Sequence, residues 1–219
     1  AESRDHLHEA FTGDLDAMAS RRLIRAGVAV NRTHYFIDRG VQRGIAYDSF
    51  RLFDQELNEG RQTGLLRINV AFVPLSRDQL LMSLKNGQVD VVAAQLTITP
   101  ERLKEVDFSN PTRTNVSQIV VSGPGSAPMS GPEALSGQSV FVRKSSSFYT
   151  ALTELNERLV REQKAPVTIT EAPENLEDDD ILEMVNAGLV PMTIADDYMA
   201  TFWSKVFTKL RLHKAAALQ

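Results

Sequence analysis

Hydrophobic and polar residues recur with two different periods along the first half of the chain, and these periods predict strands and helices. Alternation with period two predicts strands at 23–30 and 66–73, and a nearly continuous apolar run predicts a fully buried strand at 89–94. Turn residues fill the region around 38–44. Apolar residues three to four positions apart predict helices at 14–20, 47–57 and 77–86, the last ending at Gly87. This order of elements is typical of an α/β layer architecture.

A second α/β series follows a stretch rich in glycine, proline and serine at 122–132. A strand is predicted just before it, at 116–121. Beyond it the same patterns predict strands at 139–143, 167–169 and 192–194, and helices at 148–162, 180–187 and 198–206. The most economical interpretation is two similar α/β lobes. It divides the chain into a leader with the first helix at 1–19, lobe 1 at 20–118, a hinge at 119–126 and lobe 2 at 127–208.

Composition narrows the class of partner. The net charge of −4 argues against nucleic acid, and no apolar run approaches the roughly 20 residues that span a bilayer. The chain has no cysteine, and its four histidines form no metal-ligand cluster. Because no GxSxG, Walker-type, GxGxxG or HExxH motif occurs, we expect no catalytic residue, metal or cofactor in this chain.

The most distinctive stretch runs from Thr97 to Ser109, TITPERLKEVDFS, directly after the predicted buried strand. Thr99 is a predicted helix N-cap, with Pro100 at the first helical position and Arg102 at the third. An arginine beside backbone N–H groups matches a carboxylate in charge and geometry. The alternative is a surface arginine beside an ordinary helix cap.

Two strand ends in the second half also carry polar side chains. The stretch Arg143–Ser147 is either an anion-binding loop or a serine-rich cap that satisfies the first N–H groups of a helix. Asp196 and Asp197 follow a predicted strand, where they either hold a ligand ammonium group or cap the next helix. The acidic run Glu177–Asp180 is predicted to be a solvated helix start that complements the helix dipole. Since ligands of α/β folds lie outside the carboxyl ends of the strands, a cleft between the lobes is the expected site.

Together these segments resemble the family 3 extracellular solute-binding proteins, periplasmic receptors for amino acids and related compounds, over about residues 20–207. The most specific match is TITPER at 97–102 followed by VDFS at 106–109. The resemblance implies a two-lobed, type II periplasmic-binding-protein fold with an interlobe cleft. It also implies that a return of the chain to lobe 1 starts, cut short, at 209–219. It implies that Thr97 and Arg102 bind the ligand carboxylate and that Asp196 binds the amino group. Further contacts are implied for Tyr35 and Phe36 on the ligand side chain and, from the second lobe, for Arg143, Ser145, Ser146 and Ser147.

Three positions depart from the family pattern. Gln95, which we include in the candidate site, stands where many amino-acid receptors carry a glycine whose carbonyl faces the ligand. Ser145 and Ser147 replace residues that are often glycine. These changes add side-chain bulk to the expected cleft, which argues against ordinary tight amino-acid binding.

Two stretches, Thr33–Phe36 and Glu177–Asp196, are similar to the regulatory module of the F-type membrane-bound lytic transglycosylases. In those proteins the module precedes a murein-cleaving domain. The similarity implies a small-molecule ligand derived from peptidoglycan, such as a stem-peptide fragment or an amino acid. It also implies a periplasmic location, an outer-membrane association of the full-length protein, and a covalent link to a C-terminal catalytic domain. Two alternatives stay open, a free amino-acid receptor of an importer and the sensor domain of a membrane kinase.

Overall fold

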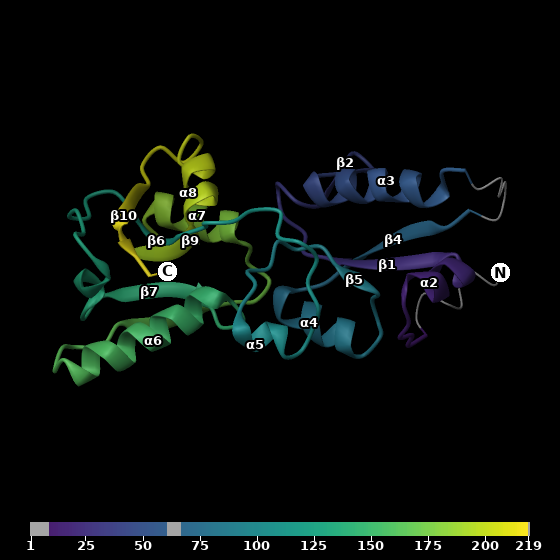
Figure 1. Cartoon of the computed structure of the whole chain (residues 1–219). Coiled ribbons are helices and arrows are strands. Elements are labelled where there is room, and N and C mark those ends of the chain that lie inside the picture. The colour runs from purple at the N-terminus through teal and green to yellow at the C-terminus, as the bar shows by residue number, and fades with distance from the viewer. Residues whose placement is uncertain (1–8, 61–66, 219) are drawn as a thin grey trace. The chain divides into compact units, whose positions relative to one another are not determined.

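The computed structural model describes residues 9–60 and 67–218, and the chain divides into two compact units (Figure 1). Unit 1 extends to Phe108 and unit 2 begins at Ser109. Each unit has its own sheet and its own buried apolar clusters. The division agrees with two α/β lobes, although it falls earlier in the chain than the hinge predicted at 119–126.

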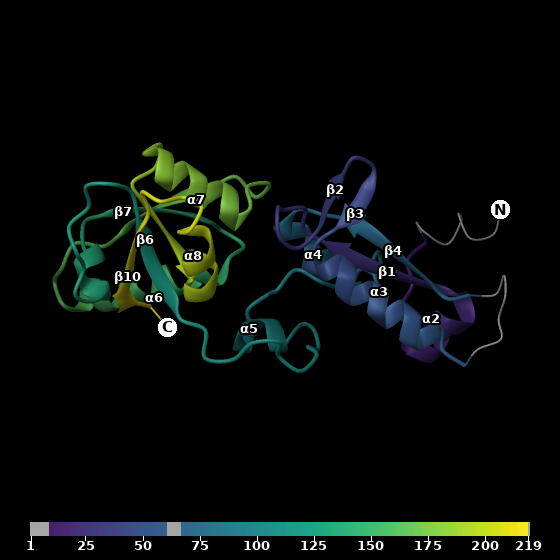
Figure 2. The same ribbon diagram turned by 90° about the horizontal axis from the view of Figure 1, so that it is seen from above.

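Unit 1 is built on a parallel sheet of strand order β4-β1-β5. The central strand β1 (Leu23–Val28) is buried along its whole length, and it pairs with β4 (Asn69–Pro74) and β5 (Val91–Val92). The helix α3 (Ile45–Asn58) covers one face of this sheet (Figure 1). The helices α2 (Leu15–Arg21) and α4 (Arg77–Lys85) cover the other face (Figure 1 and Figure 2). The carboxyl ends of all three strands therefore meet at one edge of the sheet.

Several elements of unit 1 differ from the sequence prediction. The predicted turn region contains a hairpin of two three-residue strands, β2 (Phe36–Asp38) and β3 (Val41–Arg43), which are too short to show a period. The strand predicted at 89–94 forms ladder pairs only at Val91–Val92. Residues 1–8 of the predicted leader and residue 66 of the strand predicted at 66–73 lie outside the described residues.

Within the leader predicted at 1–19, Phe11 contacts the rest of unit 1. Its N–H donates to the carbonyl of Gly87 at 2.9 Å, and the guanidinium of Arg21 lies 3.8 Å from its ring centroid. Gly87, the predicted helix stop, has a φ of +66°, and a Cβ there would lie 2.6 Å from the carbonyl oxygen of Phe11. Gly87 therefore provides both the left-handed turn that ends α4 and the room for this contact.

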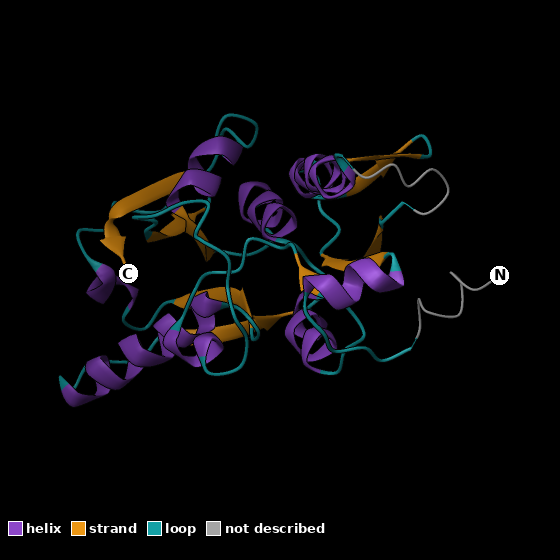
Figure 3. Ribbon diagram, turned by 45° about the vertical axis from the view of Figure 1, so that its right-hand side comes forward, coloured by secondary structure: helices purple, strands orange, loops and turns teal. Residues whose placement is uncertain are grey.

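Unit 2 contains an antiparallel sheet of order β10-β6-β9 and a parallel pair, β7 and β8. Thr193 Oγ1 of β9 donates to the carbonyl of Phe141 in β7 at 2.7 Å, so the two groups of strands lie side by side. The helices lie on both sides of these strands, as Figure 3 shows. The strands are β6 (Gln118–Ser122), β7 (Ser139–Arg143), β8 (Thr168–Ala172), β9 (Met192–Asp196) and β10 (Arg211–Ala217); the helices are a 3₁₀ turn η2 (Pro132–Leu135), α6 (Ser147–Arg161), α7 (Asp178–Ala187) and α8 (Asp197–Trp203).

The central strand β6 is buried on both faces, which explains its continuous apolar pattern. Val120 packs in the cluster that contains the apolar face of α6, including Leu152. Ile119 and Val121 pack in the cluster on the opposite face, with α7 and α8. Residues 119–122 therefore form part of the core of unit 2, where the sequence predicted a hinge.

The end of the described chain also belongs to unit 2. Residues 211–217 form β10, which pairs antiparallel with β6 through Arg211–Ser122 and Leu212–Val121. The prediction placed the start of a return to lobe 1 here. The difference arises because strand pairing depends on which edge of β6 is available, and the local sequence does not specify that edge.

Candidate functional site

Thr99 begins the short helix α5 (Pro100–Leu103) as the sequence predicts. Its backbone is extended, with φ −120° and ψ 155°, and its hydroxyl accepts a hydrogen bond from the N–H of Arg102 at 3.3 Å. Pro100 occupies the first helical position. The predicted cap is confirmed. Since α5 is only four residues long, its charge chemistry comes from the Arg102 side chain rather than from a helix dipole.

Two guanidinium groups are held at the carboxyl edge of the unit 1 sheet. Arg102 Nη1 donates to the carbonyl of Thr97 at 2.8 Å, and Arg77 Nη1 donates to the carbonyl of Ala94 at 3.0 Å. Burial and, to a smaller extent, the charge of Arg77 lower the pKa of Arg102. The positive charges of Arg77 and Arg102 therefore interact across the segment that follows β5.

Arg77 was not among the predicted site residues. A signal was nevertheless present in the sequence, because Arg77 is the first residue of α4 and follows the carboxyl end of β4 by three positions. Like Thr97 and Arg102, it is a polar residue that follows the end of a parallel strand, where ligands of α/β folds bind.

Gln95 lies in the same segment in a left-handed conformation, with a φ of +48°. Glycine adopts that region without steric cost, whereas a residue with a Cβ does so under strain. The exposed Gln95 thus keeps the backbone conformation that a glycine would favour. This agrees with the glycine expected at that position from the family resemblance.

The two predicted aromatic contacts have different environments in unit 1. Tyr35 is only 3% exposed, and its ring stacks on Phe72 with a centroid distance of 5.1 Å. Burial, with a smaller effect from Tyr47, raises the pKa of Tyr35. Phe36 is half-buried in β2. Tyr35 therefore belongs to the packed core of unit 1, and the ligand contact predicted for the pair stays a prediction.

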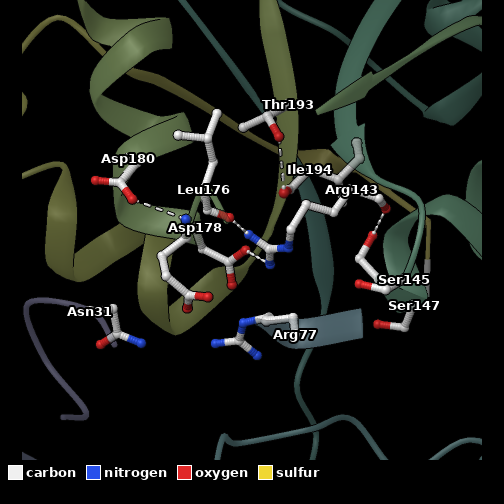
Figure 4. A network of polar contacts seen from close by, with 12 residues as sticks. Asn31, Arg77, Arg143, Ser145, Ser147, Leu176, Asp178, Asp180, Thr193 and Ile194 are labelled. Atoms are coloured by element: carbon white, nitrogen blue, oxygen red, sulfur yellow. Dashed lines mark hydrogen bonds and ion pairs between the residues drawn. The ribbon is translucent and has the colours of Figure 1, made fainter. Parts of the chain in front are cut away.

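Arg143 ends β7 and has a buried side chain that links two segments of unit 2 (Figure 4). Its guanidinium donates to the carboxylate of Asp178 and to the carbonyl of Leu176. Arg143 Nε is also buried and has no hydrogen-bond partner. These contacts of the Arg143 side chain are structural ones within unit 2.

The three serines that follow have three distinct roles. Ser146 is the N-cap of α6: its Oγ accepts from the N–H of Tyr149 at 3.2 Å and donates to the carbonyl of Arg143 at 2.7 Å. Ser145 donates from its N–H and its hydroxyl to the carboxylate of Glu174. Ser147 is buried and accepts from Gln118 Nε2 at 3.1 Å. The capping interpretation therefore holds for Ser146, while the other two hydroxyls contact side chains.

Asp196 and Gln118 face each other across the antiparallel pair of β9 and β6. Asp196 is the backbone N-cap of α8, but its side chain makes no capping hydrogen bond; Asp197 Oδ1 accepts from the N–H of Tyr198 instead. Gln118 is 2% exposed, and its Oε1 has no hydrogen-bond partner. Gln118 and Ser147 thus lie at the same end of the sheet as Asp196. Gln118 was not among the predicted site residues, because the sequence placed it only within the strand predicted at 116–121.

The acidic run at the start of α7 is not solvated, contrary to the prediction. Glu177 and Asp179 are 4% and 2% exposed. Glu177 and Asp180 form a reciprocal capping box, and Asp178 pairs with Arg143. The capping box compensates the desolvation of Glu177, and the ion pair compensates that of Asp178.

No group of three or more His, Asp or Glu side chains in residues 9–60 and 67–218 has an arrangement that could hold a metal ion. None of the helices in the same part of the chain is long and apolar enough to cross a membrane.

The fold belongs to a known structural class. A putative L-cystine ABC transporter protein from Listeria monocytogenes aligns with a TM-score of 0.71 at 20% identity, covering 87% of this chain and 76% of that one. An ancestral amino-acid-binding protein, a precursor of cyclohexadienyl dehydratase, aligns with a TM-score of 0.70 at 22% identity, covering 91% and 80%. The chain therefore has the two-lobed type II fold of the periplasmic amino-acid-binding proteins.

Residues 24–207 match the model of the bacterial extracellular solute-binding proteins, family 3, and the chain belongs to that family. Membrane-bound lytic murein transglycosylase F of Vibrio cholerae is 27% identical over 205 residues, which are 90% of this chain and 37% of that protein. The protein of the same name from Idiomarina loihiensis is 29% identical over 187 residues, with 83% and 37% covered. The chain thus spans little more than a third of the length of these relatives.

Proposed function

We propose that this chain is the ligand-sensing module of a peptidoglycan lytic transglycosylase, and that it binds an amino acid or a stem-peptide fragment. The observation that carries the proposal is the pattern of coverage: nearly the whole chain aligns with about a third of each transglycosylase. The rest of those relatives is long enough to contain at least one further domain. On this proposal the solute-binding module regulates a covalently linked catalytic domain.

The ligand's carboxylate binds at Arg102. A guanidinium presents a planar set of donors that matches a carboxylate, and Arg102 is oriented by its bond to the carbonyl of Thr97. The pKa lowered by burial indicates that this cation is partly removed from water, which strengthens its attraction for an anion. In unit 2, the carboxylate of Asp196 supplies the complementary charge for a ligand ammonium group.

The module senses ligand and does no chemistry of its own. It works in the periplasm, where peptidoglycan fragments are released, and the full-length protein is attached to the outer membrane. Binding changes the population of the module's conformations, and the catalytic domain responds to that change.

A thermal-shift screen of the 219-residue chain against amino acids and muropeptides tests the binding part of this proposal. A ligand that binds only the folded state raises the unfolding midpoint, by an amount that grows with its concentration above Kd. The regulatory part needs the full-length protein, whose murein-cleaving rate should change with the same ligand. A chain that digests peptidoglycan by itself, or a full-length enzyme indifferent to the ligand, would contradict the proposed roles.

A free receptor that delivers an amino acid to an importer is the second candidate. Its support is the set of solved structures with the same fold, which include a putative transporter protein and amino-acid-binding proteins. The gene distinguishes the two candidates. A reading frame that stops just beyond this chain, next to permease genes, favours transport, whereas a continuation encoding another domain favours the transglycosylase.

A further inference from the structure

The helix α8 and the turn after it carry apolar side chains on two different stripes. Ala200, Trp203 and Phe207 pack in the core cluster on one side of β6. Phe202 and Val206 point away from that cluster and are 49% and 59% exposed. The N–H of Phe207 donates to the carbonyl of Trp203 at 2.7 Å, so the helical winding continues beyond the end of α8. Because residues four positions apart share a helix face, Phe202 and Val206 are neighbours on the surface.

Two lysines accompany these exposed apolar side chains. Lys205 lies three positions after Phe202, and Lys209 follows Lys205 by four. Both lysines are exposed, and neither forms an ion pair within the described part of the chain. The whole chain has a net charge of −4, yet residues 198–218 contain four Lys and Arg residues and no Asp or Glu. This part of the surface is therefore basic as well as apolar.

The end of α7 lies beside the same segment, because the N–H of Lys209 donates to Asn186 Oδ1 at 2.9 Å. Leu189, three residues after Asn186, is 72% exposed. Glu183 is the one exposed carboxylate of α7. Among the large hydrophobic residues that are exposed in the described ranges, Phe202 is the only aromatic one. The basic–apolar face is defined here as Leu189, Phe202, Lys205, Val206 and Lys209.

The size and composition of the basic–apolar face favour a membrane surface over a folded protein as its partner. A stable protein–protein interface buries about 800 Å² on each partner, around a centre depleted of charged residues. Three apolar side chains interspersed with lysines do not provide such a centre. A bilayer surface accepts this pattern, because apolar side chains enter the headgroup region while lysines stay beside anionic phosphates.

We propose that the basic–apolar face binds a membrane surface that contains anionic lipids. Phe202 and Val206 enter the headgroup region, and Lys205 and Lys209 contact lipid phosphates. The inference goes beyond the proposed function and does not depend on it, because the face contains none of the residues assigned to the ligand. With only a few side chains buried, the contact is peripheral and reversible.

Co-sedimentation of the 219-residue chain with lipid vesicles tests this proposal. Vesicles of phosphatidylcholine with about one-third phosphatidylglycerol are compared at low salt with vesicles of phosphatidylcholine alone. We expect at least about tenfold tighter binding to the anionic vesicles, since each lysine near such a surface contributes about a factor of five. Added salt should weaken this binding because it screens the lysines. Equal binding to both kinds of vesicle, or binding to neither, overturns the proposal.

A double variant, Phe202→Ser with Val206→Ser, tests the assignment to this face. It is expected to bind anionic vesicles at least about tenfold more weakly, because two apolar side chains no longer leave water. Val160→Ser is the matched control, since Val160 is 59% exposed on α6 and precedes the exposed Arg161. That variant should bind as the wild type does, and circular dichroism establishes that both variants fold. Full binding by the double variant, or an equal loss in the control, overturns the assignment.

The single tryptophan of the chain provides an independent readout. The ring centroid of Trp203 lies 5.3 Å from that of Phe202, so this ring approaches the lipid when the basic–apolar face does. Lipids that carry a quencher in the upper part of the acyl chain should therefore quench its fluorescence in anionic vesicles. Binding without quenching would place another face on the membrane and overturn the proposal.

Sedimentation with lipid-free peptidoglycan, and sedimentation velocity of the chain alone, distinguish the other possible occupants. A wild type that binds peptidoglycan or self-associates through this face but ignores vesicles overturns the membrane proposal. A loss in the double variant that is confined to vesicle binding supports it. Neither result affects the ligand-sensing role, because the thermal-shift screen for that role contains no lipid.

Discussion

The guanidinium of Arg143 pairs with the carboxylate of Asp178 and thereby joins the end of β7 to the first turn of α7. The side chain of Arg143 is 2% exposed and that of Asp178 is 25% exposed, so the pair is largely shielded from water. The family resemblance assigned Arg143 to ligand binding, whereas these contacts give it a structural role in unit 2.

Replacing Arg143 by methionine is expected to destabilise the chain strongly. The change removes the donor that Arg143 provides to the carboxylate of Asp178 and to the carbonyl of Leu176, and breaking such a buried pair costs about 3 kcal/mol. Urea unfolding measures the loss. Lys144→Met is the matched control, since Lys144 is exposed and pairs with Glu171 at the surface; its effect should stay below about 1 kcal/mol. Wild-type stability of Arg143→Met combined with weakened ligand binding would instead support the role implied by the resemblance.

Arg102→Ala should weaken binding of the ligand found in the thermal-shift screen. Each charge-assisted hydrogen bond lost contributes about 1.5–3 kcal/mol, which corresponds to at least a tenfold rise in Kd. Calorimetry measures this change. Lys104→Ala removes an exposed cation at the end of the same short helix and is expected to leave Kd unchanged. Unchanged affinity in Arg102→Ala would reject Arg102 as the carboxylate anchor.

His213 is expected to make stability depend on pH. Its Nδ1 accepts from the N–H of Met129 at 3.3 Å, so Nε2 carries the proton toward Ser122 Oγ, 2.7 Å away, and the buried ring is neutral. Burial and then the charge of Arg211 lower the pKa of His213 below its ordinary value of 6.5. The unfolded chain therefore takes up the proton first as the pH falls.

The stability contributed by the neutral ring is complete above the unfolded-state pKa, near pH 6.5, and is lost as the pH falls below it. The loss from one group is at most about 1.4 kcal/mol per pH unit. Urea unfolding between pH 8 and pH 5 should show a smaller decline for His213→Gln than for the wild type, because the remaining groups titrate alike in both proteins. Parallel declines would show that His213 does not carry the effect.

Gln95→Gly is expected to preserve or raise the free energy of unfolding. Glycine relieves the strain of the left-handed backbone, which offsets the greater freedom it gives the unfolded chain. The same change in the helix, Gln79→Gly, should cost about 1 kcal/mol because glycine is a poor helix former. Chemical denaturation of the two variants provides the comparison. Equal losses at both positions would mean that no strain is relieved at Gln95.

The local chemistry of capping was predictable because it needs only neighbouring residues. Thr99, Pro100 and Arg102 occupy the predicted positions of a helix start, and Gly87 ends α4 in a left-handed turn. The burial of Glu177 was not predictable in this way. The ion pair beside it joins Asp178 to Arg143, which lies 35 residues earlier in the chain.

The residues of the candidate site likewise differ in whether they could be predicted from neighbouring residues alone. Arg102 was selected from its own motif, whereas Arg77 belongs with it only because β4 and β5 end at the same edge of the sheet. Gln118 gained its significance from strand register, which places it opposite Asp196. Neither relationship can be predicted from a single segment of the sequence.

The sequence by itself determined the two α/β series and most of their elements, because hydrophobic period and capping chemistry act over a few residues, and its motifs carried the family resemblance. Only the tertiary structure decided that 119–122 lies in the core of unit 2, that 211–217 pairs with it, and that Arg77 and Arg102 both contact the segment 94–97. The physical reason is that strand pairing and electrostatic contacts join residues distant in sequence, and many pairings are compatible with the same local pattern.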